Sequence, residues 1–116
     1  MQLAPFFPIL YRILHPTFPH CLWAGNPNLK TIALTFDDGP HPTYTPELLE
    51  VLDHYAIPAS FFWLGACVNR APFTAKQVYD RGHWIGLHGY DHRSFPVLTT
   101  VELQQSLRAT QDAIAK

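Results

Sequence analysis

The sequence predicts an α/β fold with a parallel sheet, and three observations support this prediction. Strand-like and helix-like patterns alternate three times between residues 30 and 116, an order that implies right-handed crossovers between parallel strands. Hydrophobic residues make up 47% of the chain and charged residues only 15%, so the composition is that of a folded protein. Carboxylate and imidazole side chains directly follow the first and third predicted strands.

Residues 1–29 are expected to form an irregular, proline-rich arm, followed by one domain over residues 30–116. Five prolines of the arm fall among aromatic and leucine side chains, and no regular period persists. Pro5 and Pro8 interrupt the apolar first residues and no Lys or Arg precedes them, so a secretory signal is not supported. No apolar run is long enough to predict a membrane span. The cell envelope and the cytoplasm both stay open as locations.

The domain is predicted to begin with a strand and a helix. Apolar residues alternate with small or polar ones from Lys30 to Phe36, and the turn residues Asp37–Pro40 end this strand. A helix follows, because Thr45 offers a capping hydroxyl and Pro46 suits the first helical position. The apolar face expected for this helix consists of Leu48, Val51, Leu52 and Tyr55.

Two further strands and helices complete the pattern. The short apolar run 59–64 is typical of a strand buried on both faces, and residues 83–87 of a third strand. A helix is expected over 72–81, after a loop. Thr99 and Glu102 have the spacing of a capping box for a last helix that runs to the end of the chain. Its predicted buried face consists of Leu103, Leu107, Thr110 and Ile114.

Three parallel strands are few for an α/β sheet. Parallel sheets normally have both faces covered, and a closed barrel of such units typically needs about 250 residues. The last predicted helix is still running at Lys116. We therefore expect residues 30–116 to be the truncated N-terminal portion of a larger α/β domain, with open sheet edges and a missing C-terminal half of the same domain as a partner.

Two carboxylates and two imidazoles are predicted to share one edge of the sheet. Asp37 and Asp38 follow the first strand, and His88 follows the third strand, with His92 four residues later. The carboxyl ends of parallel strands meet at one rim, where α/β folds place their active sites. Imidazole nitrogen and carboxylate oxygen are ligands of Zn²⁺ and its first-row neighbours, and a second carboxylate can serve as a general base.

Each motif alone has a simpler interpretation. Asp-Asp-Gly-Pro after a strand is ordinary turn chemistry, and His-x-x-x-His without a helical context is a weak metal signal. Two His and one carboxylate also form the iron site of non-haem oxygenases, although an acid beside a ligand has no evident role there. The joint placement of both motifs on one rim favours a metal site.

These motifs resemble those of the polysaccharide deacetylases with the NodB homology domain, carbohydrate esterase family 4. The resemblance extends from about residue 30 to residue 116 and is strongest at the first motif. The matching segments are Thr35-Phe36-Asp37-Asp38-Gly39-Pro40, Tyr44-Thr45-Pro46, Ala59-Ser60-Phe61-Phe62 and Gly86-Leu87-His88 to His92.

The resemblance implies a distorted (β/α) barrel and a metal-dependent hydrolase of non-peptide carbon–nitrogen bonds in carbohydrate metabolism. Asp37 would be the catalytic base, and Asp38, His88 and His92 would hold a divalent metal, usually zinc, with cobalt or another first-row ion as a substitute. The substrate implied is an N-acetylated polysaccharide or oligosaccharide, such as chitin oligomers or peptidoglycan, from which acetyl groups are removed.

The chain departs from the family pattern in two respects. Gly89 stands where Ser or Thr is usual and Arg93 where Pro is frequent. The family's later motifs, an arginine segment, an Asp/Trp segment and a Leu-x-His segment that supplies the general acid, have no match in these residues. A non-catalytic fragment or carbohydrate-binding relic is therefore the alternative hypothesis. Nucleic acid is not an expected partner, because the formal net charge is −1.

Overall fold

The computed structural model describes residues 7–21, 24–26 and 28–116. The chain divides into two compact units, Met1–Ile32 and Ala33–Lys116, which are considered separately. The second unit is an α/β structure with three parallel strands and four α-helices, so the predicted fold class is confirmed. Among the described residues, no helix has the length and apolar character that crossing a membrane requires.

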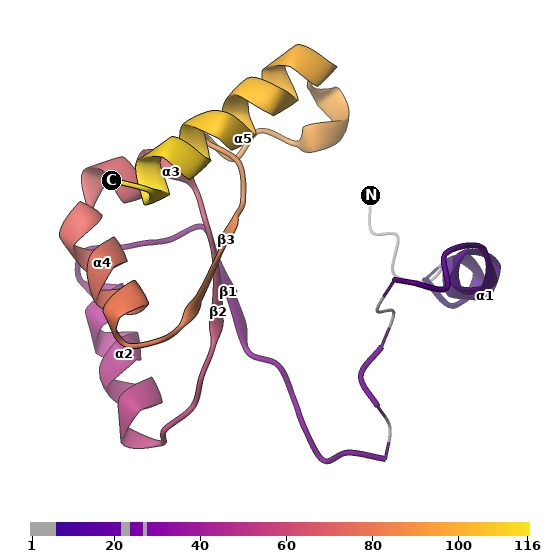
Figure 1. Cartoon of the computed structure of the whole chain (residues 1–116), viewed down its shortest axis with the longest axis horizontal. Coiled ribbons are helices and arrows are strands. Elements are labelled where there is room, and N and C mark those ends of the chain that lie inside the picture. The colour runs from indigo at the N-terminus through magenta and orange to yellow at the C-terminus, as the bar shows by residue number, and fades with distance from the viewer. Residues whose placement is uncertain (1–6, 22–23, 27) are drawn as a thin grey trace. The chain divides into compact units, whose positions relative to one another are not determined.

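The sheet has the order β1-β2-β3, with β2 in the middle, and its three strands are labelled in Figure 1. The strands are β1 (Thr35–Asp37), β2 (Ser60–Trp63) and β3 (Trp84–Leu87). Phe36 pairs with Phe61 and Phe61 with Ile85, so these residues lie in one row across the sheet. Because all three strands are parallel, their carboxyl ends lie at one edge.

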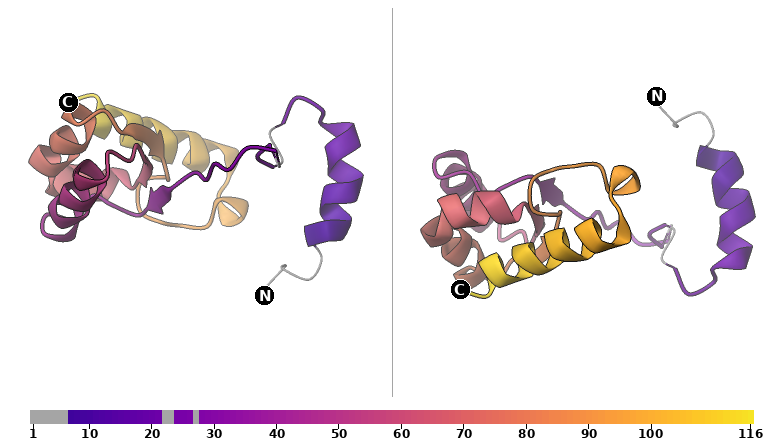
Figure 2. Two further views of the ribbon diagram at one scale, coloured as in Figure 1. Left: turned by 90° about the horizontal axis from the view of Figure 1, so that it is seen from below. Right: turned by 90° about the horizontal axis from the view of Figure 1, so that it is seen from above.

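Four α-helices and one short 3-10 helix accompany the sheet. The connections after β1 and β2 contain α2 (Tyr44–His54), then α3 (Gly65–Arg70) and α4 (Pro72–Asp80). After β3 come the 3-10 helix η2 (Phe95–Val97) and α5 (Thr100–Ile114). Figure 2 shows α3 beside α5, and these two helices are in contact.

The hydrophobic core forms between the helices and one face of the sheet. Phe61 and Trp63 of β2 point into it, as alternate residues of a strand must. It also contains Leu49 and Leu52 of α2, Val68 of α3, Ala75 and Val78 of α4, and Ala113 of α5. On the opposite face, Phe62 is 38% exposed and Trp84 74% exposed. The prediction that β2 is buried on both faces is therefore wrong, because no helix of residues 33–116 covers that side.

The predicted first strand is shorter than expected. Only Thr35–Asp37 belong to the ladder, whereas Ile32 is 87% exposed. The reason is the length of the partner strand, because β2 begins at Ser60, whose N–H donates to Leu34. A parallel strand extends only as far as its neighbour provides hydrogen-bonding groups.

The buried face of α2 is rotated relative to the predicted one. In α2 the buried residues are Thr45, Leu49 and Leu52, whereas Val51 and Tyr55 are exposed. Thr45 does not cap the helix end. Its hydroxyl accepts a hydrogen bond from the His41 N–H, and His41 Nδ1 accepts the N–H groups of Thr43 and Tyr44 at the start of α2. His41, and not Thr45, therefore accepts backbone N–H groups at the start of this helix.

The predicted irregular arm contains a helix. Residues Phe7–Thr17 form α1, although the sequence carries prolines at 8 and 16. Pro8 lies in the first turn, where its missing N–H has no intrahelical partner to lose, and Pro16 comes one residue before the helix ends. The prediction of an irregular segment was therefore wrong here. Both prolines lie close to a helix end, where a helix tolerates them.

Candidate metal centre

The structure brings Asp38, His88 and His92 together at the carboxyl end of the sheet. Asp38 follows β1 and His88 follows β3, so their convergence results from the parallel arrangement of the strands. Oδ1 of Asp38 lies 3.2 Å from Nε2 of His88 and 3.2 Å from Nε2 of His92. One ligand atom from each residue lies within 4.8 Å of the other two. Three residues that are up to 54 positions apart in the sequence thus form one cluster.

Two of the three residues have left-handed backbone conformations. The φ angle is 71° at Asp38 and 62° at His92. This region disfavours most side chains but is several-fold enriched in Asp, Asn and His. Such conformations cluster at functional sites, where the surrounding contacts hold them. At Asp38 the backbone N–H donates to Phe62 at 3.0 Å, which continues the ladder past the end of β1.

The loop between the two histidines is held by α3. The first backbone N–H groups of this helix are orphan donors, and they need acceptors. Gly65 donates to the carbonyl of Gly89 at 3.1 Å, and Ala66 donates to that of Tyr90 at 3.0 Å. Because the His88 N–H also bonds to Trp63 at 2.9 Å, the loop is anchored on both β2 and α3.

The same loop is held from the other side by α5. The hydroxyl of Ser106 accepts the Tyr90 N–H at 2.8 Å, and Ser106 is 7% exposed. Gly65 allows this close packing, since a Cβ there would lie 2.6 Å from the ring of Tyr90 and 2.8 Å from Cα of Thr110. The sequence prediction did not single out Ser106, because a serine in a helix carries no sequence signal for such a role.

The two departures from the family motif have defined positions. Gly89 has a φ of 88°, and a Cβ there would lie 3.0 Å from the ring of Phe95. Arg93 forms ion pairs with Asp91 at 3.0 Å and with Glu102 at 3.3 Å. Arg93 therefore connects the histidine loop to the first turn of α5.

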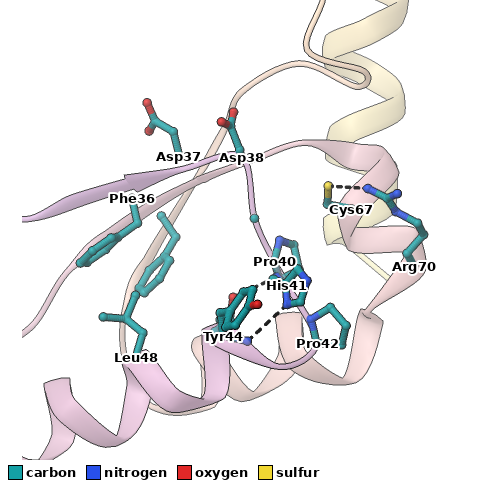
Figure 3. A pocket seen from close by; sticks show the side chains of 13 residues that line it. Phe36, Asp37, Asp38, Pro40, His41, Pro42, Tyr44, Leu48, Cys67 and Arg70 are labelled. Carbon is teal, nitrogen blue, oxygen red and sulfur yellow. Dashed lines mark hydrogen bonds between the residues drawn. The ribbon is translucent and has the colours of Figure 1, made fainter.

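Asp37 and Asp38 are among the residues that line a pocket of about 590 Å³. Figure 3 shows both carboxylates leaving the end of β1 on the side away from Tyr44 and His41, which line the pocket below. The Tyr44 ring stacks on the His41 imidazole at 4.4 Å. Both Asp37 and Asp38 are exposed, so a solute can reach their carboxylates.

The donor set fits a divalent metal ion. Ligand atoms bound tetrahedrally to one zinc ion at about 2.0–2.1 Å lie about 3.3 Å apart. The two Asp38–histidine distances, each 3.2 Å, agree with this separation. One carboxylate and two imidazoles are also the mixed oxygen and nitrogen set that suits zinc and its first-row neighbours.

Comparison with known proteins identifies the family. The family model described as "Polysaccharide deacetylase" matches residues 24–116, which is most of the chain. The chain belongs to the polysaccharide deacetylase family. It is thus a member of carbohydrate esterase family 4, of the NodB type, as its motifs predicted.

Polysaccharide deacetylases of known function and structure match the same region. A peptidoglycan-N-acetylglucosamine deacetylase of Bacillus cereus is 46% identical over 84 residues, which cover 72% of this chain and 39% of that protein. The structure of the peptidoglycan deacetylase PdaC from Bacillus subtilis superposes with a TM-score of 0.72 at 39% identity, over 78% of this chain and 45% of that chain. The chain thus spans less than half the length of these relatives.

The structural neighbours also include a pseudoenzyme. A mutant of BA3943, described as a pseudoenzyme of carbohydrate esterase family 4, superposes with a TM-score of 0.72 at 32% identity. The match covers 78% of this chain and 33% of that chain. The family therefore includes proteins named as deacetylases and a protein described as a pseudoenzyme.

Proposed function

We propose that this protein takes part in the metal-dependent removal of acetyl groups from N-acetylated sugars in a polymer. The observation that carries the proposal is the distance of 3.2 Å from Oδ1 of Asp38 to each imidazole, beside the free end of β1 where Asp37 stands. Peptidoglycan is the favoured substrate class, because the relatives named above are peptidoglycan deacetylases.

Asp38, His88 and His92 are the proposed ligands of a divalent ion, most simply Zn²⁺, with Co²⁺ or another first-row ion as a substitute. A divalent ion at such a site supplies Lewis-acid polarisation of a carbonyl and lowers the pKa of bound water. The loop contacts from α3 and Ser106 keep His88 and His92 in position. These residues therefore bind and orient, and they take no proton in the proposed reaction.

Asp37 is the proposed general base. Its carboxylate precedes the ligand Asp38 in the chain and is exposed at the rim. There it would accept a proton from water as this water adds to the acetamide carbonyl carbon. A correctly placed general base contributes about 10²- to 10⁴-fold to the rate of such a reaction.

The metal part of the proposal is tested by titrating Co²⁺ into the chain and recording the visible spectrum. We expect one bound ion per chain and the absorption bands of a site with mixed nitrogen and oxygen ligands. His88→Ala and Asp38→Asn should lose this binding, whereas His54→Ala, which removes an exposed imidazole of α2, should retain it. Equal affinities in all four proteins would refute the site.

The catalytic part is tested by acetate release from an N-acetylglucosamine oligomer with Zn²⁺ present. We expect slow release by this chain, since it carries no match to the family's general-acid segment and such a group is worth about 10²- to 10⁴-fold. Asp37→Asn should bind the metal as the native chain does but release no acetate. Measurable acetate release at the same rate by the native chain and by Asp37→Asn would remove Asp37 from the mechanism.

A second candidate function is sugar binding without turnover. The similarity to a pseudoenzyme of the family favours it. In this case the chain would bind metal and the oligomer, and acetate release would be absent from the native chain as well as from Asp37→Asn. Oxygen uptake dependent on Fe²⁺ would instead indicate an oxygenase, which uses the same types of ligand.

A further inference from the structure

The helix α1 is amphipathic, and its apolar side is exposed. Ile9, Leu10, Ile13 and Leu14 follow the i, i+1, i+4, i+5 spacing that places them on one side of a helix. Ile9 is 57% exposed, Leu10 41% and Ile13 59%. Four aliphatic side chains on a helix of 11 residues therefore form an apolar strip, and three of them are exposed.

The opposite side of α1 is polar and cationic. Arg12 and His15 lie on it, three residues apart. The Tyr11 ring lies on the same side, with its centroid 5.2 Å from that of the His15 imidazole. A cationic polar face opposite an aliphatic face is the composition of helices that lie in a membrane interface, and tyrosine is enriched in that layer.

The surrounding sequence has the same charge bias. All nine acidic residues of the chain come after residue 36, whereas Arg12 and Lys30 come before it. The segment 1–36 is therefore purely cationic, although the whole chain has a formal net charge of −1. Such a segment is complementary to an anionic surface, because it has no acidic side chain that this surface would repel.

We propose that α1 lies flat in the surface of an anionic lipid bilayer, with Ile9, Leu10, Ile13 and Leu14 among the acyl chains. An α-helix of 11 residues is about 16 Å long, which is about half the thickness of the hydrocarbon core, so it lies along the surface and does not cross. A lipid surface suits both sides of α1, because its acyl chains accept the aliphatic side and its headgroups attract Arg12. This proposal does not depend on the function proposed for the metal centre.

The test is co-sedimentation of the full chain with lipid vesicles. We expect binding to vesicles of phosphatidylcholine with phosphatidylserine, and much weaker binding to vesicles of phosphatidylcholine alone. Arg12→Glu should lower the affinity for the anionic vesicles by about 30-fold, because it changes the charge by two units. About 1 M NaCl, where the screening length is about 3 Å, should release the native chain only in part, since its apolar contacts remain.

Matched substitutions test whether vesicle binding depends on the apolar side of α1 or on exposed apolar side chains in general. Ile13→Asp should lower vesicle binding by at least about tenfold, and Ile13→Leu should leave it unchanged. Val101→Asp is the control, because Val101 is 60% exposed on α5, nearly the same as Ile13, and its replacement should not affect binding. Circular dichroism of each variant with and without vesicles reports whether α1 is helical.

Three outcomes would overturn the proposal. The first is no sedimentation of the native chain with anionic vesicles, and the second is equal binding by the native chain and Ile13→Asp. The third is self-association of the chain that Ile13→Asp abolishes while vesicles have no effect, because a second copy would then cover α1. Equal binding to neutral and anionic vesicles would remove the part of the proposal that concerns charge.

Discussion

Ser106 supports the proposed metal centre without contacting any of the proposed ligands. It accepts the Tyr90 N–H at 2.8 Å in the middle of the loop that joins His88 to His92. The Thr110 hydroxyl, which is fully buried, donates in turn to the Ser106 carbonyl at 2.8 Å. The position of both imidazoles therefore depends on a hydroxyl group of α5.

Replacing Ser106 by Ala should weaken metal binding as well as folding. The change leaves the Tyr90 N–H without its acceptor, a loss worth about 1–3 kcal/mol if no water replaces it. We expect the affinity for Co²⁺ to fall by about tenfold, at the low end of the range for residues that orient metal ligands. Isothermal titration measures this, and Gln105→Ala, an exposed neighbour on α5, is the control. An unchanged affinity in Ser106→Ala would show that α3 alone holds the loop.

The cluster of Asp38, His88 and His92 was predictable because it depends on topology. Parallel strands place the residues after their carboxyl ends on one rim, and the strand pattern was clear enough to locate those ends. The left-handed backbone at Asp38 and His92 was not predictable, since both residues also occupy ordinary conformations. The contact from Ser106 depends on how α5 packs on α3, which no local pattern encodes. The catalytic role of Asp37 stays a prediction.

The capping box of α5 is the local feature that the sequence predicted most accurately. The Thr99 hydroxyl accepts the N–H of Glu102 at 3.3 Å, and the Glu102 carboxylate accepts the Thr99 N–H at 2.9 Å. Thr99→Ala removes the first of these bonds. We expect a loss of about 1 kcal/mol in the free energy of unfolding, measured by urea denaturation. A control substitution at Thr100, one residue inside the helix, should cost less.

Glu102 makes the stability of this helix start dependent on pH. The pKa of its carboxyl is lowered from the ordinary value of 4.5, first by the hydrogen bond from the Thr99 hydroxyl and then by the one from the Thr99 N–H. The stabilisation is therefore complete above pH 4.5 and is lost as the pH falls through the lower pKa of the folded state. Thermal melting below pH 4.5 should show a smaller loss of stability in Glu102→Gln than in the native chain. If Glu102→Gln lost as much stability below pH 4.5 as the native chain, this role of Glu102 would be wrong.

The errors in the predicted helices have a common physical origin. Periodicity locates a helix, but tertiary packing decides which side is buried, and in α5 the buried residues are Ser106, Thr110 and Ala113. Leu103 and Leu107, which were expected in the core, are only half-buried. The prediction gave too little weight to small residues. Close contacts between helices, such as that of α5 with Gly65 of α3, require them. The six residues of α3 were predicted as a loop because a helix this short has no readable period.

The proposed metal centre joins the two edge strands of the sheet, which do not pair with each other. Asp38 follows the edge strand β1, whereas His88 and His92 follow β3 at the other edge. The core lies on one face of the sheet, and the other face exposes Phe62 and Trp84. A ligand that binds at the rim therefore connects the first strand to the last one, and the unfolded chain has no such preformed site.

Metal binding should raise the thermal stability of residues 33–116. A ligand that binds only the folded state adds about 2.7 kcal/mol when its concentration is 100 times its Kd. For a domain of this size, about 1 kcal/mol corresponds to a shift of about 4–8 °C in Tm. Differential scanning calorimetry should therefore show a rise of about 10–20 °C with saturating Zn²⁺, which EDTA reverses. Asp38→Asn should remove most of this rise, because it leaves the two histidines without the carboxylate from β1, and His54→Ala should keep it. If Asp38→Asn melted with the same Zn²⁺-dependent rise as the native chain, the ion would bind elsewhere and the two edges of the sheet would not be joined by it.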